Sequence, residues 1–305
     1  MRFPRTLSLL PLTVFALLLP TLAYADFQAG LDAYDRKDYA TALKEWQPLA
    51  EQGDAKTQYY LGVLYAQGWG VPQDWAQAAD WYRQAAKQGH ARAQSFLGSL
   101  YNYGLGVPQD DAQAADWYRQ AAKQGDDNAQ AELGSLYKHG QGVPQDYVQA
   151  AKWFRLAAEQ GLALAQHSLG VMYYEGQGVP QDYAEAARWF RLAAKQGQAA
   201  AQFNLGVLYH SGQGVPQDYA QARDWYRKAA KQGQADAQFL MGSMYDEGQG
   251  VPQDYVQAHM WINLAAAQGN ELAVKYRKLL ATKMTPAQIA EAQHLAHEWL
   301  AQHQK

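Results

Sequence analysis

The chain has 305 residues, of which 48% are hydrophobic and 18% are charged, a composition typical of an ordered globular protein. Its formal net charge is −3 and it contains no run of Lys or Arg, which argues against nucleic acid or an anionic membrane surface as a partner. It has no cysteine, so disulfides, thiolate zinc sites, cysteine nucleophiles and cysteine-linked lipid anchors are excluded.

Residues 1–25 have the composition of a secretory signal peptide. Two arginines precede an uncharged stretch, residues 6–25, which has an apolar centre and ends in Ala23-Tyr24-Ala25. This order of basic, apolar and small-x-small segments is typical of a cleaved signal, and polar Asp26 follows directly. We therefore expect cleavage before Asp26 and a mature protein that is periplasmic or secreted.

An uncleaved membrane anchor is the alternative, because a stretch of about 20 residues could just span a bilayer. Pro11 and Pro20 lie within the stretch, and together with its small-x-small ending they favour cleavage. The sequence thus predicts no stable membrane anchor in the mature protein.

A fixed period of 36 residues organises most of the chain. The tetrapeptide Val-Pro-Gln-Asp returns at this interval without slippage, beginning at Val71, Val107, Val143, Val179, Val215 and Val251. Such a period indicates a solenoid, in which one supersecondary unit cannot bury its own apolar face and stacks on copies of itself.

The first half of each copy has a helical pattern. Between Thr57 and Tyr65 the residues that recur are spaced three, four and seven apart, which puts them on one side of a helix. Gly62 is a glycine in all six copies, although a glycine inside a helix costs up to about 1 kcal/mol relative to alanine. We therefore expect another helix to approach there too closely for a side chain. Gly68 and Gly70 then supply the unusual backbone angles of a loop.

A second helix is predicted to begin at Asp74, which forms an Asp-x-x-Gln capping pattern with Gln77. Pro72, just before it, prevents the first helix from running on. One Trp per copy, Trp81 in the first, is expected to fill the space between the helices, and Gly89 to end the second helix. We assign the repeated Asp and Gln residues to capping and solubility. Each unit is therefore predicted to be a helix hairpin.

Both ends of the chain depart from the period. Residues 26–53 read as a copy without the Gly-x-Gly loop, and we expect this atypical unit to cap the stack. After the last copy, Glu271–Ala281 reads as a helix, and Pro286 begins an amphipathic helix that reaches about His303. We interpret residues 270–305 as C-terminal capping helices, with a partner-binding helix as the alternative.

The repeated motifs resemble the Sel-1-like repeat, a relative of the tetratricopeptide repeat with a longer loop between its helices. The matching motifs are Ala-Gln-x-x-Leu-Gly-x-x-Tyr, Gly-x-Gly-Val-x-x-Asp, Ala-x-x-Trp and Ala-Ala-x-Gln-Gly, and six copies occupy residues 54–269. The resemblance implies an all-α fold: a right-handed α-solenoid superhelix of stacked helix hairpins with 36-residue repeats. It also implies that the first helices line the concave surface.

The positions of the first helix that vary between copies lie opposite the fixed ones, so we expect them to face solvent or a ligand. They mix aromatic with polar residues, as protein-binding grooves do. An alternative is that some of the aromatic side chains only pack against the next repeat. The candidate contact residues are Tyr59, Tyr60, Phe96, Tyr103, His139, His167, Tyr174, Phe203, Asn204, His210, Phe239 and Asp246.

The sequence contains no catalytic constellation. His294 and His297 lie about one helical turn apart, but a zinc site needs a third ligand, and a solvated helix face is the better interpretation. The Gly-x-Gly loops lack the residues that cradle phosphate, and neither Gly-x-Ser-x-Gly nor His-Glu-x-x-His occurs. We therefore expect no enzyme, no metal and no cofactor.

The leading hypothesis is an exported, non-enzymatic scaffold or adaptor, monomeric, that binds a protein or peptide on its concave face. Bacterial relatives that resemble this arrangement act in envelope processes or in contact with host proteins. An alternative is a cell-wall-related protein that binds peptidoglycan or β-lactams, as has been associated with some cysteine-rich exported relatives. A third hypothesis is a structural spacer, which would tolerate substitutions all along the variable side.

Overall fold

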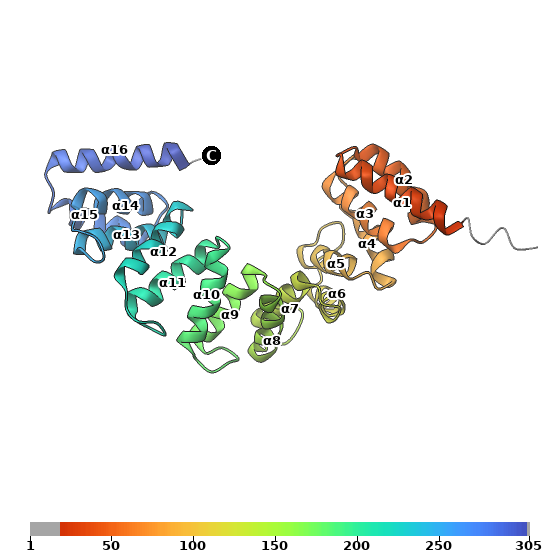
Figure 1. Ribbon diagram of the computed structural model, residues 1–305, viewed down its shortest axis with the longest axis horizontal. Helices are drawn as coiled ribbons and strands as arrows, with labels where there is room; N and C mark the ends of the chain where they lie inside the picture. The colour runs from red at the N-terminus through yellow and green to blue at the C-terminus, as the bar shows by residue number, and fades with distance from the viewer. Residues whose placement is uncertain (1–18, 304–305) are drawn as a thin grey trace, which may run out of the picture. The chain divides into compact units, whose positions relative to one another are not determined.

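The computed structural model of the protein describes residues 19–303, with side chains from Phe27 onward, so the predicted signal peptide lies largely outside the described residues. Within them the chain forms sixteen α-helices and no strand (Figure 1). Their bounds are α1 (Leu19–Asp35), α2 (Tyr39–Glu51), α3 (Ala55–Gln67), α4 (Trp75–Lys87), α5 (Ala91–Tyr103), α6 (Asp111–Lys123), α7 (Asp127–His139), α8 (Tyr147–Glu159), α9 (Ala163–Glu175), α10 (Tyr183–Lys195), α11 (Ala199–Ser211), α12 (Tyr219–Lys231), α13 (Ala235–Glu247), α14 (Tyr255–Ala267), α15 (Glu271–Ala281) and α16 (Pro286–His303).

The predicted α-solenoid of helix hairpins is confirmed. The helices divide into two compact units: unit 1 comprises residues 1–133 and 141–144, and unit 2 comprises residues 134–140 and 145–305. In unit 1 the hairpins α1–α2, α3–α4 and α5–α6 follow one another, and each packs on the next. In unit 2 the hairpins α9–α10, α11–α12 and α13–α14 do the same, and both α15 and α16 pack on α14.

The helix ends lie where the sequence predicts them. Asp74 caps α4, since its Oδ1 accepts from the backbone N–H groups of Ala76 and Gln77 at 2.9 and 3.0 Å. The Gln77 side chain donates to the Asp74 carboxylate at 3.3 Å, rather than reaching back to the backbone as in a full capping box. These hydrogen bonds lower the pKa of the Asp74 carboxyl. At the other end of α3, Gly68 has a φ of +68°, so the predicted loop glycine is confirmed.

The repeated mid-helix glycine faces an aromatic ring of the second helix. A Cβ placed on Gly62 would lie 2.5 Å from ring carbons of Tyr82, and Tyr82 is 1% exposed. The expected close approach is therefore confirmed, but the ring that fills the space follows the repeated tryptophan, and Trp81 itself is partly exposed. The expectation for the tryptophans holds only in part: position 82, and not position 81, points at the glycine, whereas the equivalent Trp189 and Trp261 are buried. The same pairing joins Gly98 to Tyr118, Gly134 to Phe154, Gly170 to Phe190 and Gly206 to Tyr226, whereas Gly242 meets the aliphatic side chain of Ile262.

The repeated glutamines link helices to one another. Gln58 on α3 is 3% exposed and donates from Nε2 to the carbonyl of Ala50 on α2 at 3.0 Å. Its Oε1 accepts from Gln88 Nε2 at the end of α4 at 2.8 Å, and Gln88 also donates to the Gly53 carbonyl. One buried amide thus joins three consecutive helices. The fixed, inward-facing side predicted for this helix is thus confirmed at Gln58, and solubility does not account for it, because a buried amide with both ends bonded contributes structure. The equivalent links involve Gln94, Gln166, Gln202 and Gln238.

The loop between the two helices is held at both sides. Gln73 donates from Nε2 to the carbonyl of Ala66 at 2.8 Å and so satisfies a free carbonyl at the end of α3. Gly106 has a φ of +69°, and a Cβ there would collide with the backbone of Trp75 at the start of α4. Each loop therefore stacks on the second helix of the preceding repeat, which requires a glycine.

At the N-terminus, α1 runs through the expected cleavage point between Ala25 and Asp26. The chain after this point is firmly packed: Trp46 on α2 is fully buried, stacks against Phe27 with ring centroids 6.0 Å apart, and donates from Nε1 to the Phe27 carbonyl. At the C-terminus, α15 and α16 begin and end where the sequence predicts. Trp299 of α16 lies edge-on to Trp261 of α14, with ring centroids 6.0 Å apart. From Leu19 to His303, no helix is long and apolar enough to cross a membrane.

Candidate functional site

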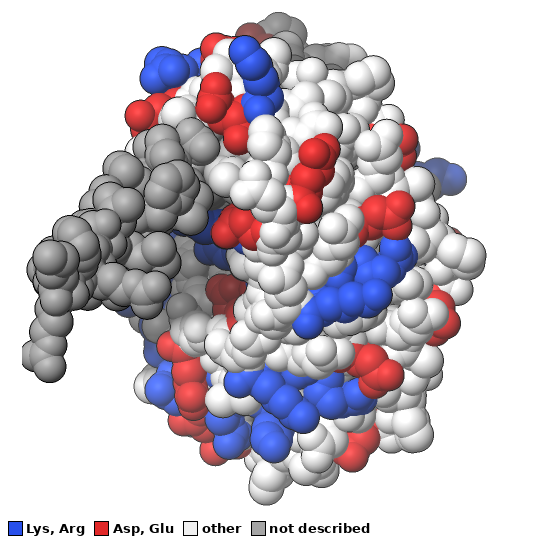
Figure 2. All heavy atoms as spheres, turned by 90° about the vertical axis from the view of Figure 1, so that its right-hand side faces the viewer, with Lys and Arg blue, Asp and Glu red and all other residues white. Residues whose placement is uncertain are grey.

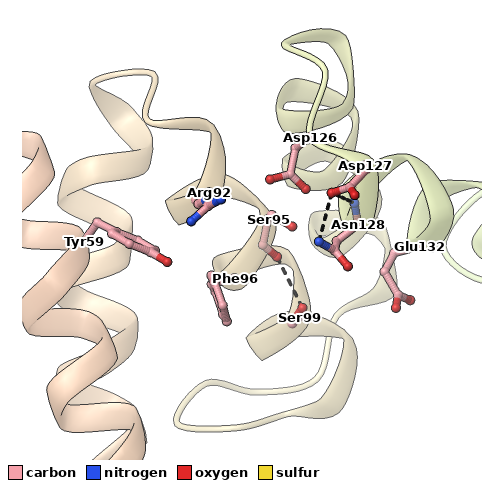
Figure 3. Close-up of a pocket in the computed structure, with 9 residues that line it drawn as sticks. All are labelled: Tyr59, Arg92, Ser95, Phe96, Ser99, Asp126, Asp127, Asn128 and Glu132. Atoms are coloured by element: carbon pink, nitrogen blue, oxygen red, sulfur yellow. Dashed lines mark hydrogen bonds between the residues drawn. The ribbon is translucent and has the colours of Figure 1, made fainter. Parts of the chain in front are cut away.

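Three first helices of unit 1 line a hollow of about 480 Å³. We call it the Phe96 hollow. Figure 3 shows Phe96 and Arg92 between Tyr59 on one side and a group of acidic residues on the other. Helix α3 contributes one residue, α5 contributes four, and the remaining four lie at or within the start of α7. The lining residues are Tyr59, Arg92, Ser95, Phe96, Ser99, Asp126, Asp127, Asn128 and Glu132.

The floor of the Phe96 hollow is aromatic and rigid. Phe96 is 43% exposed, which is unusual for so large an apolar side chain, and its ring stacks on Tyr82 at 5.4 Å. Tyr59 lies 6.0 Å from Phe96 and stacks on His90 at 4.8 Å. Burial raises the pKa of the Tyr59 hydroxyl, while nearby Arg92 acts in the opposite direction. Two rings therefore present one face to solvent and are fixed from behind.

The walls of the Phe96 hollow carry charge of both signs. Asp126 caps α7 by accepting from the Ala129 N–H at 2.8 Å, and Asp127 accepts from the backbone and the side chain of Asn128. Partial burial raises the pKa of the Glu132 carboxyl. Glu132 has no hydrogen bond or ion pair to any residue between 19 and 303, so its oxygens are available to a partner. A ligand in the hollow would meet apolar rings, one guanidinium and three carboxylates.

The sequence predicts Tyr59 and Phe96 as contact residues but misses Arg92, Asp126 and Asp127. These three lie ahead of the fixed pattern that begins at position 57 or its equivalent. Variation between copies would have identified Arg92, because its position holds Lys, Arg, Asn, Leu, Ala and Asp in the six repeats, but Asp127 replaces an alanine that the other five copies share.

In unit 2, predicted contact residues line a smaller hollow of about 210 Å³. Tyr174 lies on α9, and Phe203 and Asn204 lie on α11; all three line this hollow and are partly exposed. The Asn204 amide is 3.1 Å from Nε2 of His167, and burial lowers the pKa of the His167 imidazole. His210 packs edge-on to Tyr219 at 5.1 Å. Its buried Nδ1 has no hydrogen-bond partner among the described residues.

Three predicted contact residues are engaged inside the chain. Tyr60 stacks on Trp46 at 4.7 Å within the N-terminal aromatic cluster, and Phe239 packs edge-on to Tyr276 of α15. Asp246 is 4% exposed and accepts from the Tyr276 hydroxyl at 2.5 Å. It differs from the expectation of an open contact residue, because the C-terminal segment already binds its carboxylate.

The two remaining predicted residues lie at helix ends. Tyr103 is the most exposed large apolar side chain of the described part of the chain, at 64%. His139 is exposed, and its Nδ1 lies 2.9 Å from the carbonyl of Ser135.

Neighbouring repeats meet at residues 37 positions apart, as His167 and Asn204 do. A contact surface on the first helices is therefore formed by side chains from two adjacent copies. On the face shown in Figure 2, positive and negative side chains are interspersed among uncharged ones, and neither sign covers the face. Between residues 19 and 303, no group of three or more His, Cys, Asp or Glu side chains could hold a metal ion.

Stacked helix hairpins with a fixed period and variable first helices define a repeat solenoid of the tetratricopeptide-like class. The sequence profile of the Sel1 repeat matches residues 55–90, 91–126, 127–162, 163–198, 199–234 and 235–270. The chain therefore belongs to the Sel1 repeat family, and the resemblance noted from its motifs is confirmed. Proteins of this family generally serve as protein–protein interaction scaffolds and are typically not enzymes.

Two solved structures are similar to most of this chain. A Sel1 repeat protein from Oxalobacter formigenes is 32% identical with a TM-score of 0.70, over 79% of this chain and 96% of that one. A protective antigen of uropathogenic Escherichia coli strains, which displays the same repeat fold, is 27% identical with a TM-score of 0.52, over 93% of this chain and 85% of that one. No curated protein matches the chain.

Proposed function

We propose that the protein is an exported, non-enzymatic scaffold that binds a protein or peptide on the concave face formed by its first helices. In unit 1 the contact surface is the Phe96 hollow. The observation that carries this proposal is the 43% exposure of Phe96 in a hollow of about 480 Å³ with charged walls. Exposed aromatic anchors beside fixed polar groups are characteristic of interaction hot spots.

The chemistry of the walls indicates what the hollow accepts. An apolar side chain of the partner covers Phe96 and Tyr59, and a neighbouring Lys or Arg pairs with the carboxylates of Asp127 and Glu132. Arg92 donates to an acidic group or a carbonyl of the same segment. The preferred partner is therefore an extended segment with a basic residue next to an apolar one.

Export is the second part of the proposal and rests on the composition of residues 1–25. The similarity to a protective antigen supports a setting in the cell envelope or in contact with a host. Protein purified from the envelope is expected to begin at Asp26 by intact mass. An Ala25→Asp change at the cleavage site is expected to leave the full-length precursor. Mature wild-type protein that still contains residues 1–25 would contradict export with cleavage.

A photo-crosslinking residue at Ser99 tests the binding surface, because Ser99 lines the hollow without forming its aromatic floor. Crosslinked partners from the native envelope or from host serum are identified by mass spectrometry, and their affinity is then measured with purified protein. Phe96→Ala is expected to weaken binding about tenfold or more, as loss of an aromatic anchor does.

The matched control is Val148→Ala. This valine is 63% exposed on α8, a second helix, so truncating it removes exposed apolar area that does not belong to the Phe96 hollow. Equal affinity of wild type and Phe96→Ala for every partner would remove the Phe96 hollow as the binding site.

A further inference from the structure

The C-terminal helices of unit 2 enclose a second hollow, far in sequence from the Phe96 hollow. It has a volume of about 440 Å³ and lies between α14, α15 and α16. One wall is polar and is formed by Asn263 of α14, Arg277 of α15, and Gln293 and His297 of α16. This volume falls within the range of roughly 300 to 1,000 Å³ that is typical of pockets for small ligands.

The remaining wall of the C-terminal hollow is apolar. It is formed by Leu264 and Ala267 of α14 and by Ala296 and Leu300 of α16. Leu264 and Ala296 belong to the buried core of unit 2, so this wall is firmly supported. A ligand therefore meets an apolar surface large enough for one side chain, directly beside a polar edge.

Arg277 is held in place by a chain of polar contacts. The buried imidazole of His259 lies 3.0 Å from the Asn263 side-chain nitrogen, which leaves the Asn263 oxygen turned toward Arg277 at 3.4 Å from Nη1. This is the only hydrogen bond of the Arg277 guanidinium within residues 19–303. Most of its N–H donors are therefore unused and are presented at the hollow.

Arg277 lacks the ion pair that several arginines of the repeats form, and it also lacks the tyrosine hydroxyl that Arg155 and Arg191 contact. Arg83, Arg119 and Arg188 each form an ion pair with an acid three residues earlier. Arg277 forms no ion pair with any acidic residue between 19 and 303. A half-buried guanidinium without a carboxylate favours an anion supplied from outside.

We infer that the C-terminal hollow binds the free C-terminal carboxylate of a polypeptide whose last residue is apolar. Arg277 takes the carboxylate, and the wall of Leu264 and Leu300 takes the terminal side chain. The amides of Asn263 and Gln293 bond to the peptide groups before it. This site is separate from the Phe96 hollow, and the inference does not depend on the function proposed for that hollow.

The mixed lining distinguishes a peptide from a fatty acid. Four of the eight lining residues are polar, and a peptide backbone uses them as donors and acceptors. An acyl chain would place methylene groups against Gln293 and His297 and would need a longer apolar surface.

The test uses fluorescence polarisation with the labelled peptide Gly-Ser-Ala-Ala-Ala-Leu, as the free acid and as the C-terminal amide, on the full mature chain. The free acid is expected to bind. The amide is expected to bind at least about tenfold more weakly, because a charge-assisted hydrogen-bond pair is lost. Arg277→Gln is expected to lower the affinity for the free-acid peptide by the same factor.

Lys278→Gln is the matched control, because it removes one positive charge from an exposed position of the same helix. It is expected to leave affinity within about twofold. Gln293→Glu, on the exposed side of α16, keeps the core intact and is expected to abolish binding by giving Arg277 an internal acid. Phe96→Ala is expected to have no effect here.

Four results would each overturn the inference: no binding of the free acid at millimolar protein, equal binding of acid and amide, equal losses in Arg277→Gln and Lys278→Gln, or equal competition by octanoate. Circular dichroism spectra and melting temperatures verify that each variant is folded.

Discussion

Lys283 donates from Nζ to both carboxylate oxygens of Asp246, at 2.9 and 3.0 Å, and so fastens the segment after α15 to α13. The Asp246 side chain is 3% exposed, whereas Lys283 remains 42% exposed, so water screens the ion pair only from one side. Together with the Tyr276 hydroxyl, these groups close the stack at its C-terminal end.

We predict that Asp246→Ala destabilises the C-terminal end by about 1–3 kcal/mol, because the Tyr276 hydroxyl and Lys283 lose their acceptor. Urea unfolding measures the loss, and limited trypsin digestion is expected to cut within α15 before other sites. Glu247→Ala, at the exposed neighbouring position, should change neither. Equal effects of the two substitutions would contradict a role for the Asp246 cluster.

Gly62→Ala is predicted to be destabilising, although alanine is the better helix former. The added methyl group would meet the Tyr82 ring at 2.5 Å, and such overpacking costs about 1–3 kcal/mol. The gain in helix propensity offsets at most about 1 kcal/mol of this. A double-mutant cycle with Tyr82→Leu measures the coupling by thermal and urea unfolding. Additive effects would show that the methyl group and the ring do not clash.

Gln58→Ala is predicted to cost about 1–3 kcal/mol, since it removes the hydrogen bonds that a buried amide makes to the Ala50 carbonyl and from the Gln88 amide. Gln67→Ala, at an exposed position of the same helix, is the control and should be nearly neutral. Urea unfolding of both variants decides the point, and similar midpoints would argue against a structural role for the buried amide.

The caps predict a pH dependence. Hydrogen bonds from the first turn of the helix lower the pKa of Asp74, Asp110 and Asp218 in the folded protein. Their contribution to stability is therefore present above the ordinary aspartate pKa of about 4, and it is lost as the pH falls through the lowered values. Changing all three to Asn keeps a capping oxygen but removes this titration. Melting temperatures followed from neutral to acid pH should fall less steeply in the triple variant than in the wild type.

The repeat and its helix boundaries could be predicted because they depend on local chemistry. Asp74, Gly68 and Gly89 act on the few residues beside them, and six copies show the same choice. The partner of Gly62 could not be read in this way. Trp81 and Tyr82 are neighbours on one helix, and only the rotation of α4 against α3 decides which ring points inward.

The candidate site was predicted in part for a similar reason. Variation between copies identified Phe96 and Tyr59, but it did not reveal that Asp246 would be covered, since its partners lie beyond the periodic region. Three of the four charged side chains of the Phe96 hollow, Arg92, Asp126 and Asp127, lie at helix starts, where the repeat pattern does not indicate which side chains come together. Such convergence depends on the offset between adjacent repeats.

Because each loop glycine sits on the backbone of the preceding copy, every internal repeat offers the same docking geometry to the next. Duplication of one 36-residue block in the gene would therefore lengthen the stack without disturbing either end. The closing aspartate travels with the final block, and the new block would add one more variable helix. Evolution can in this way add binding surfaces one repeat at a time, while the capping helices at the two ends of the stack stay unchanged.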